Sequence, residues 1–225
     1  MSRIFLVRHG QASFGSHDYD RLTPAGVAQC EQLARHWGAI GRTVDLVFSG
    51  TLRRQRESAE AFARAGARAG AAPPVVRPVA GFEEYDHDAL LAAHARVPAT
   101  AAEHEDRRDF HRRLAASLGA WTEGTLAGVE TYAAFRDRCA GALTRLMAEI
   151  GRGRQAVLFA SAGSLATAMQ PALGIGDADL MRLKLNFHNT GVSSLLFDGE
   201  TITIECLNAI AHLEQPGFTQ LITHR

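Results

Sequence analysis

The residues best suited to chemistry lie near the start of the chain, where the apolar segment of residues 4–7 ends in Arg8, His9 and Gly10. Such a segment predicts a β-strand, and in α/β proteins ligands bind beyond the carboxyl ends of the sheet strands. There an arginine binds anions, a neutral imidazole is nucleophilic near pH 7, and a glycine lets the backbone approach a ligand closely. This placement indicates phosphoryl transfer through a phosphohistidine at His9, although a structural histidine at a strand end would look the same.

Two later segments also join polar residues to predicted elements. Thr23 and Pro24 are typical of the N-cap and first position of a helix, here predicted over residues 24–39. A strand predicted over residues 44–48 is followed by Ser49 and then by Arg54, near the start of a helix predicted over residues 52–68. Each segment therefore brings a polar group to the end of an element.

Together these segments resemble the signatures of the histidine phosphatase superfamily, in its phosphoglycerate mutase-like branch. Those signatures are Arg-His-Gly, Leu-Thr-x-x-Gly-x-x-Gln and Ser-x-x-Leu-x-Arg, and they occur in this order at residues 8–10, 22–29 and 49–54. The resemblance extends from residue 4 to about residue 213 and is weakest from residue 86 to 129. It implies an α/β fold with a phosphate pocket built around the first histidine.

By this resemblance, Arg8 and Arg54 hold the phosphoryl oxygens. A guanidinium group suits this role because its planar fork donates paired, charge-assisted hydrogen bonds to phosphate. Arg54 has the family's spacing, two residues after Leu52, whereas Arg53 and Arg56 are expected to be solvated arginines on the helix.

The general acid is expected in the segment of residues 81–85, which resembles the family's Leu-x-Glu segment and follows a strand predicted over residues 75–79. Glu84 matches the acid's position, and Glu83 and Asp86 are its rivals. A glutamic acid can protonate a leaving alkoxide if desolvation and the phosphate charge raise its pKa.

The main departure from the family follows a strand predicted over residues 156–160, where Ser161-Ala162-Gly163 replaces the usual Ser-His-Gly. Ala162 and Gly163 would border the phosphate, but Ala162 lacks the charged hydrogen bond that the family's second histidine donates. Loss of one such donor typically costs about 10²–10³ in rate. Three explanations remain open: helix N-terminal amides at Gly163 and Ser164 compensate, another histidine compensates, or the protein binds phosphorylated ligands without turnover.

Other histidines and one asparagine are secondary candidates. Asn189 lies in a segment resembling the family's Asn-rich loop and is expected to contact phosphate oxygens, and the adjacent His188 is a possible replacement for the missing histidine. His212 belongs to a pattern that is usually structural. The predicted insertion holds four histidines with no i, i+4 pair for zinc, so solvation or selection of an anionic substrate is expected for His87, His94, His104 and His111.

A second departure separates hydrolysis from mutase chemistry. Phosphoglycerate mutases of this family carry an asparagine a few residues after Arg-His-Gly, and Gly15 stands at that position here. Ser13 and Ser16 could supply some hydrogen bonding, but such residues are usually part of a turn. The sequence therefore favours hydrolysis over return of the phosphoryl group to the substrate.

The elements that must position these residues alternate between short apolar runs and longer amphipathic ones. Further strands are predicted over residues 192–197 and 201–207, joined by a two-residue turn at Asp198-Gly199, and further helices over 101–119, 132–150 and 164–173. We expect one domain over residues 1–225: a three-layer α/β/α sandwich whose mostly parallel sheet has an antiparallel edge. Residues 85–129 interrupt the alternation, and the resemblance makes them a helical cap that selects the substrate.

The composition fits this interpretation. The chain has 225 residues, 46% of them hydrophobic, and its 24 basic residues balance 24 acidic ones, so no overall charge argues for nucleic acid or membrane partners. The cysteines, which are Cys30, Cys139 and Cys206, form no metal pattern or disulfide framework, as expected in a reducing cytosol. The first apolar run is too short for a signal peptide or a membrane span.

We therefore expect a cytoplasmic phosphomonoesterase that uses His9 and needs no metal or organic cofactor. Its partner would be a phosphorylated small molecule, and homo-oligomers are possible. A catalytically impaired phospho-ligand-binding protein is the first alternative, because of Ala162, and a phosphoglycerate mutase-type enzyme is the second.

Overall fold

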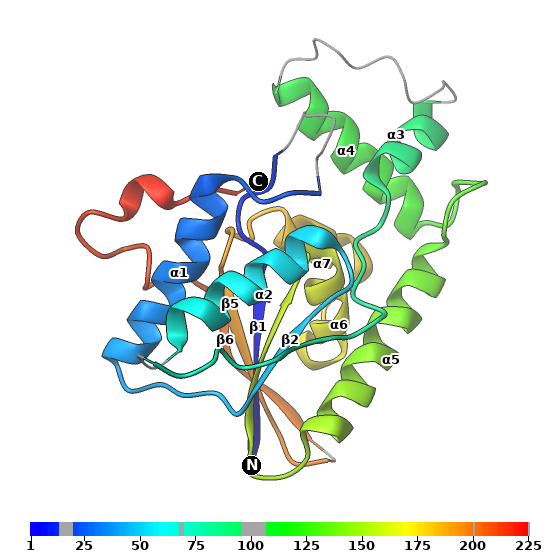
Figure 1. Ribbon diagram of the computed structural model, residues 1–225. Helices are drawn as coiled ribbons and strands as arrows, with labels where there is room; N and C mark the ends of the chain where they lie inside the picture. Colours follow the sequence, from blue (N-terminus) through cyan, green and yellow to red (C-terminus); the bar gives the residue numbers. More distant parts are fainter. Residues whose placement is uncertain (14–19, 68–69, 96–106, 200, 225) are drawn as a thin grey trace.

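The computed structural model describes residues 1–13, 20–67, 70–95, 107–199 and 201–224 (Figure 1). The strands are β1 (Ser2–Arg8), β2 (Leu46–Ser49), β3 (Val76–Pro78), β4 (Gln155–Ala160), β5 (Val192–Phe197) and β6 (Ile202–Ala209). The helices are α1 (Pro24–Ala39), α2 (Arg53–Gly66), α3 (His87–Ala95), α4 (Arg107–Thr122), α5 (Tyr132–Ile150), α6 (Ala162–Leu173) and α7 (Asp177–Lys184), with a 3₁₀ turn at Thr219–Leu221. Within these described ranges, no helix combines the length and hydrophobicity needed to cross a membrane.

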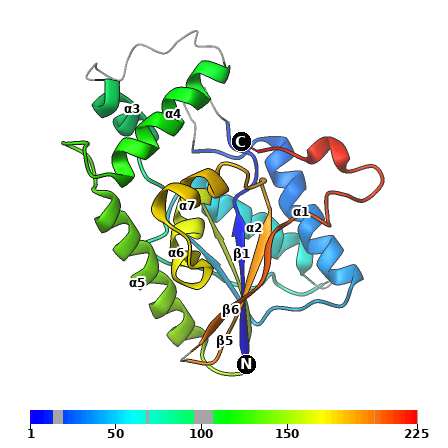
Figure 2. The same ribbon diagram turned by 180° about the vertical axis from the view of Figure 1, so that it is seen from behind.

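The strands form one sheet in the order β3-β2-β4-β1-β5-β6. Neighbours from β3 to β1 pair in parallel, whereas β5 runs antiparallel to both β1 and β6. Helices α1 and α2 cover one face of the sheet, and α5 and α6 cover the other (Figures 1 and 2). The predicted fold class, a layered α/β protein with a mostly parallel sheet, is confirmed.

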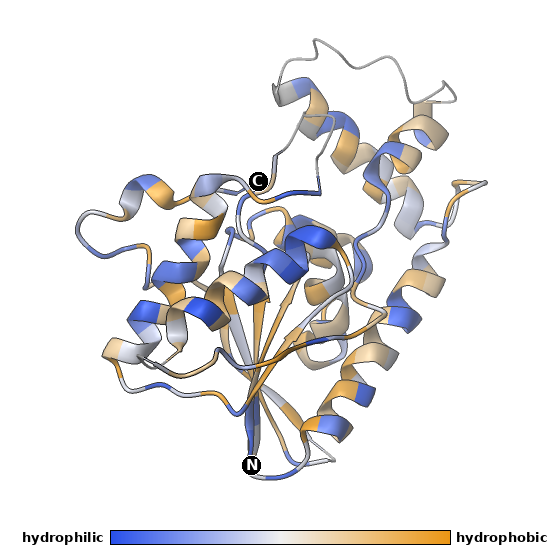
Figure 3. Cartoon of the chain, viewed as in Figure 1, coloured by the Kyte–Doolittle hydropathy of each residue, from blue (hydrophilic) through white to orange (hydrophobic). Residues whose placement is uncertain are grey.

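The alternation of side chains along β1 explains both layers. Ile4 and Leu6 belong to the apolar cluster under α5 and α6, whereas Phe5 and Val7 belong to the cluster under α1 and α2. Successive strand residues point to opposite faces, so a strand that is apolar throughout is buried on both sides. The sheet strands are accordingly hydrophobic, while α2 is largely hydrophilic on its outer side (Figure 3).

The first helix begins as predicted and packs closely on the loop after β1. The Thr23 hydroxyl caps α1 by accepting a hydrogen bond from the Gly26 amide, and Pro24 is the first helical residue. A Cβ on Gly10 would lie 2.4 Å from the Gly26 carbonyl oxygen, and one on Gly26 would lie 2.2 Å from that of Gln11. Only glycine permits this backbone contact, which fixes the loop that carries His9.

The insertion forms two helices, α3 and α4, which lie beyond the end of the sheet near which the chain's carboxyl terminus is found (Figure 1). An aromatic cluster joins α4 to α5, since the Trp121 ring lies 5.1 Å from Tyr132 and 5.2 Å from Phe135 between ring centroids. The structure starts α4 at Arg107. The first residues of the predicted helix over 101–119 lie outside the described residues.

Three local predictions need correction. Helices α3 and α7 were not expected: α7 follows the left-handed Gly174 and has acidic residues in its first turn and basic ones in its last, which stabilises even a short helix. The β5–β6 turn is shifted from the predicted Asp198-Gly199: Phe197 pairs with Ile202 and the Asp198 amide donates to the Thr201 carbonyl oxygen, so Asp198 closes the turn instead of forming its centre. Helix α6 starts at Ala162, two residues earlier than predicted.

Candidate active site

Strands β1, β2, β3 and β4 all end at one edge of the sheet, which we call the carboxyl edge. The antiparallel β5 begins there, since Val192 pairs with Val7. The loops and helix starts at the carboxyl edge carry the predicted candidates from distant parts of the sequence: His9 after β1, Arg54 after β2, Glu84 after β3, Ala162 after β4 and Asn189 before β5.

His9 is buried, and its hydrogen-bond partners define its tautomer. Its Nδ1 lies 2.7 Å from the Gly10 carbonyl oxygen, which can only accept, so Nδ1 carries the proton. Its Nε2 lies 3.2 Å from Arg54 Nε, which can only donate, so Nε2 presents a lone pair. Burial lowers the pKa of His9 well below its usual value, and the charges of Arg54 and Arg8 lower it further, against the opposing bond to Gly10. The imidazole is therefore neutral.

Arg54 is held in place by a carboxylate from the segment before α1. Its Nη1 lies 2.6 Å from Asp20 Oδ1, while the other Asp20 oxygen accepts a bond from the Arg53 amide at the start of α2. Arg54 is 7% exposed, whereas Arg53 and Arg56 are exposed. The structure therefore places Arg54, alone of these three, against His9.

Arg8 lies close enough for its charge to lower the pKa of His9, yet its guanidinium also fixes backbone. Its Nη1 donates to the carbonyl oxygens of Phe187, at 2.5 Å, and His224, at 2.9 Å. Arg8 thus ties the loop before β5 and the end of the chain to the carboxyl edge.

The three acidic candidates differ in what they contact. Glu83 accepts bonds from the Thr51 hydroxyl and the Gly81 amide and pairs with Arg138 at 3.2 Å. Burial acts to raise the pKa of Glu83, but these hydrogen bonds and the Arg138 charge outweigh it, so the pKa is lowered.

Glu84 and Asp86 have simpler surroundings. Asp86 is exposed and accepts a bond from the Ala89 amide in the first turn of α3. Glu84 Oε2 accepts a bond of 2.9 Å from the Gly163 amide in the first turn of α6. Of the three carboxylates, Glu84 is the one joined to the segment at Ala162.

Ala162 is the first residue of α6 and is 7% exposed. Its side chain is only a methyl group, which lies next to the Gly163 amide in the chain. That amide is already bonded to Glu84. The family signature predicts a histidine at residue 162, and the amides of Gly163 and Ser164 were the candidates to compensate for it. Of these two amides, that of Gly163 is unavailable while Glu84 keeps this position.

Asn189 contacts the backbone of His9 in this structure. Its buried amide group donates to the His9 carbonyl oxygen at 3.1 Å and accepts from the Thr223 hydroxyl at 2.9 Å. Contact of Asn189 with phosphate stays a prediction.

The two later histidines differ in their contacts. The His188 ring lies 4.1 Å from that of His224, and its Nδ1 accepts from the Asn208 side chain. Burial lowers the pKa of His188, and the charge of His224 adds to this effect. His212 is buried, and its Nε2 lies 2.8 Å from the hydroxyl of Thr190, a residue whose φ is positive at 56°. This contact within the fold agrees with the structural role expected for His212.

No sequence motif singles out Gln55 or Lys184, yet both belong to the carboxyl edge. Gln55 is fully buried and bonds the Leu52 amide, the Phe82 carbonyl and the Ser161 hydroxyl, so it joins the loops after β2, β3 and β4. Lys184, the last residue of α7, donates to the Tyr85 hydroxyl. One signal for Lys184 was present in the sequence: it is the only lysine of the chain.

Some expectations fall outside this description. Gly15, Ser16 and His104 are not among the described residues, and the side chain of His111 is not described either. Ser13 is described, and its amide bonds the Arg21 carbonyl oxygen. Among the described residues, no group of three histidine, cysteine or acidic side chains could hold a metal ion.

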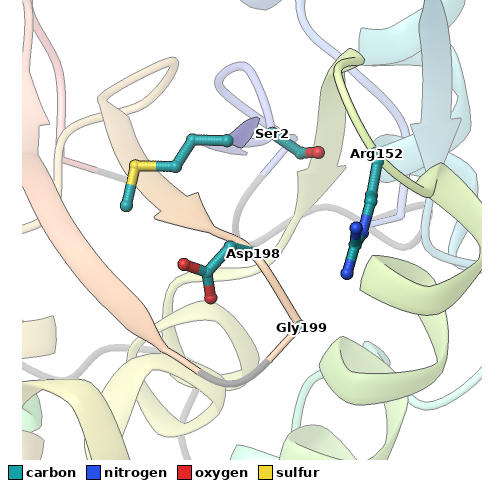
Figure 4. A pocket seen from close by; sticks show the side chains of 5 residues that line it. Ser2, Arg152, Asp198 and Gly199 are labelled. Atoms are coloured by element: carbon teal, nitrogen blue, oxygen red, sulfur yellow. The ribbon is translucent and has the colours of Figure 1, made fainter.

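A pocket of about 610 Å³ lies at the opposite end of the sheet (Figure 4). It is lined by Met1, Ser2, Arg152, Asp198 and Gly199, all exposed except Ser2. None of the predicted site residues lines this pocket, and Asp198 and Gly199 lie between β5 and β6. It carries no argument for catalysis.

The fold and its carboxyl edge define an α/β protein that presents a neutral, buried histidine beside an arginine. The sequence matches the family description "Histidine phosphatase superfamily (branch 1)" over residues 4–210, and the chain belongs to this superfamily. A search of curated proteins finds no match.

Solved structures share the fold at low sequence identity. A mutant of the phosphoserine phosphatase from Entamoeba histolytica, in complex with phosphoserine, is 17% identical with a TM-score of 0.66, over 95% of this chain and 100% of that one. A putative α-ribazole-5′-P phosphatase from Escherichia coli is 18% identical with a TM-score of 0.65, over 93% and 97%. A mycobacterial glucosyl-3-phosphoglycerate phosphatase is 22% identical with a TM-score of 0.63, over 92% and 98%.

Proposed function

We propose that the protein hydrolyses a phosphomonoester of a small molecule through a phosphohistidine at His9. The observation that carries this proposal is the state of the imidazole: Nδ1 is protonated on the Gly10 carbonyl, and the lone pair of Nε2 faces Arg54. A neutral, oriented imidazole is a nucleophile, whereas an imidazolium is not.

In the first half of the reaction, His9 Nε2 attacks phosphorus in line. The bond from phosphorus to the ester oxygen breaks, and the leaving alkoxide takes the proton of Glu84. In the second half, a water oxygen attacks phosphorus, the bond from phosphorus to His9 Nε2 breaks, and the Glu84 carboxylate accepts the proton of the water. Inorganic phosphate leaves, and both His9 and Glu84 return to their starting states.

The cations of the site would stabilise the phosphoryl group as negative charge develops on its oxygens. Arg54 would turn its donors from His9 to these oxygens, while Asp20 keeps the guanidinium in place. Arg8 would add charge from the other side, and Asn189 would hold the His9 backbone so that Nε2 stays in line.

Residue 162 is where this chain differs from the family pattern. Ala162 stands at the position of the second histidine, which is why an impaired enzyme that only binds phosphorylated ligands is our second candidate. Structures of the same fold bind phosphoserine and 3-phosphoglyceric acid, so a small phosphorylated acid is a reasonable substrate class. Helices α3 and α4 would select this substrate. The chain would act as one domain, in the cytoplasm.

The first experiment measures release of p-nitrophenol from p-nitrophenyl phosphate between pH 4 and 8. We compare wild type with His9→Ala and Ala162→His, and with His36→Ala as a control histidine in the last turn of α1. Activity that His9→Ala abolishes, that Ala162→His raises and that His36→Ala leaves unchanged supports a weakened phosphohistidine enzyme.

Two other outcomes change the conclusion. If wild type is inert and Ala162→His is active, the binding protein is the correct function. If neither is active, or if His9→Ala retains wild-type activity, the mechanism is wrong. Acid-labile ³²P retained on wild type but not on His9→Ala would identify the covalent intermediate directly.

A further inference from the structure

The basic residues of this chain are unevenly divided between arginine and lysine. Lys184 is the only lysine among the 24 basic residues, and it is the last residue of α7. Helix α7 lies near the carboxyl edge of the sheet, between α6 and the α3–α4 insertion (Figure 1). A lysine that occurs once, and at this edge, calls for a specific explanation.

Lys184 is buried against an aromatic side chain of the site. It is 6% exposed, its Nζ donates to the Tyr85 hydroxyl, and that Nζ lies 4.5 Å from the centre of the Tyr85 ring. Tyr85 is itself fixed by Trp121 and Phe135, with ring centroids at 5.1 and 5.8 Å. In this structure the ammonium group therefore lies against a packed aromatic cluster.

The charge of Lys184 has no ion-pair partner among the described residues. Burial lowers its pKa to about 8, the charge of Glu84 opposes this effect, and the charge of Arg8 adds to it. A buried cation without a hydrogen-bonded counter-ion destabilises a fold, and an apolar residue of similar size usually does better. The charges of Lys184 and Arg8 would both attract a phosphoryl group that enters here, in competition with the Glu84 carboxylate.

Lys184 also lies near the position of the missing histidine. A Cβ on Gly163 would lie 2.7 Å from Tyr85 Cε1 and 2.1 Å from Glu84 Oε1. Tyr85, whose hydroxyl accepts a bond from the Lys184 ammonium, therefore borders the first turn of α6, which begins at Ala162. Ala162 leaves this side of the site without a cation of its own.

We propose that the Lys184 ammonium binds the phosphoryl oxygens of the substrate and replaces the charged donor that Ala162 cannot supply. This inference rests on the proposed function. An ammonium has three donors on a flexible stem, so it can turn from the Tyr85 hydroxyl to phosphate oxygens without a change in the backbone. Lys184 thus contributes through its charge, and it forms no covalent bond.

A double-mutant cycle tests this replacement. Lys184→Met should lower kcat/KM for a phosphomonoester about 10²-fold, as loss of one preorganised donor does. Ala162→His should restore at least about tenfold in the Lys184→Met background and raise activity less in wild type, because the two groups do the same work. Arg182→Met, an exposed neighbour in α7, is the matched control and should change nothing.

Two outcomes of this cycle would overturn the inference. One is a Lys184→Met variant within about twofold of wild type. The other is an equal gain from Ala162→His in both backgrounds, which would mean that residues 162 and 184 act independently. Failure of the proposed function is separate, since it would appear as activity that survives His9→Ala.

A second readout does not depend on turnover. Protein made with [ε-¹³C]lysine gives a single side-chain signal, because Lys184 is the only lysine. Excess inorganic phosphate should raise the titration midpoint of this signal by about one pH unit, since a bound anion favours the ammonium form. A midpoint that phosphate does not move would overturn the inference, whether or not the protein is an enzyme.

Discussion

The two halves of the candidate site are built differently. The half after β1 and β2 joins His9 and Arg54 directly, nitrogen to nitrogen, with Asp20 behind the arginine. The half after β3 and β4 joins Glu84 to a backbone amide beside Ala162, and its cation, Lys184, comes from a separate helix. The first half therefore brings two side chains into direct contact, whereas the second offers a carboxylate beside the methyl group of Ala162.

This difference suggests how the positive charge of a phosphate site can come from different parts of a chain. A site that must hold a phosphoryl group needs positive charge on both sides, but the charge need not come from one fixed position in the sequence. At residue 162 this chain has the first residue of a helix, next to an amide bonded to a carboxylate, and its side chain is only a methyl group. The predictions below test whether the first half is indispensable and whether the second is compensated.

The largest effect is expected in the first half, from Arg54→Gln. Glutamine keeps some hydrogen bonding but loses the charge, so kcat/KM should fall by about 10²–10³. The pKa of His9 should also rise, because Arg54 contributes to lowering it, and the acid limb of the pH–rate profile should move toward neutrality.

The control for Arg54→Gln lies two residues further along α2. Arg56→Gln alters an exposed arginine and should leave both the rate and the pH profile unchanged. Equal losses in the two variants would mean that α2 contributes only general charge, and the proposed contact with the phosphoryl group would be wrong.

In the second half, Lys184→Met should stabilise the protein as it lowers activity. In the folded state the pKa of Lys184 is lowered to about 8, whereas in the unfolded chain it keeps its ordinary value of 10.5. The folded state is therefore penalised at pH 7, by an amount on the order of 3 kcal/mol, and the penalty disappears as the pH rises through this window.

Chemical denaturation of both proteins between pH 7 and 10.5 measures this effect. The free energy of unfolding of Lys184→Met should exceed that of wild type at pH 7, and the difference should shrink toward pH 10.5. Other ionisable groups titrate in both proteins and cancel in the difference. A difference that stays constant with pH would show that the ammonium is not penalised in the fold.

Glu84→Gln should separate the acid role from simple binding. With an alkyl phosphate such as phosphoserine, whose leaving group needs a proton, kcat should fall about 10²-fold. With p-nitrophenyl phosphate, whose leaving group is stable as an anion, the loss should be much smaller. Glu83→Gln, which disrupts bonds to Thr51 and Arg138, should affect both substrates alike. If Glu83→Gln shows the substrate-dependent loss instead, the assignment of the acid is wrong.

The sequence predicts the place of a site residue when neighbouring residues in the chain determine that place. His9 and Arg54 follow directly after or near strands whose apolar runs are easy to recognise, so their place at the carboxyl edge could be predicted. Glu84 could be placed in the segment, but its bond to Gly163, and the engagement of Glu83 by Arg138, depend on the packing of α5 and α6.

The parts that could not be predicted depend on long-range packing. Helix α7 has no side-chain cap and only eight residues, too few for a clear hydrophobic period, so Lys184 had no visible element to carry it. Asn189 was expected at phosphate because of its neighbours in sequence, whereas its partners are the His9 backbone and Thr223, 180 and 34 residues away. Such contacts arise only when β1, β5 and the chain end meet.

The smallest effect is expected where the second half is tightest, from Gly163→Ala. The new Cβ would lie 2.1 Å from Glu84 Oε1 and 2.7 Å from Tyr85 Cε1, so both side chains must shift, and with Tyr85 the ammonium of Lys184. The fold can absorb this by moving side chains, so we expect about a tenfold loss of kcat with alkyl phosphates, as for a small misplacement of catalytic groups.

Gly38→Ala, in α1 with no atom within 4 Å of the new Cβ, is the control: it should stabilise the protein by about 0.5–1 kcal/mol and leave the rate unchanged. Full activity in Gly163→Ala would mean that neither Glu84 nor Lys184 works from its present position, and the contrast between the two halves would then reduce to the loss of one histidine.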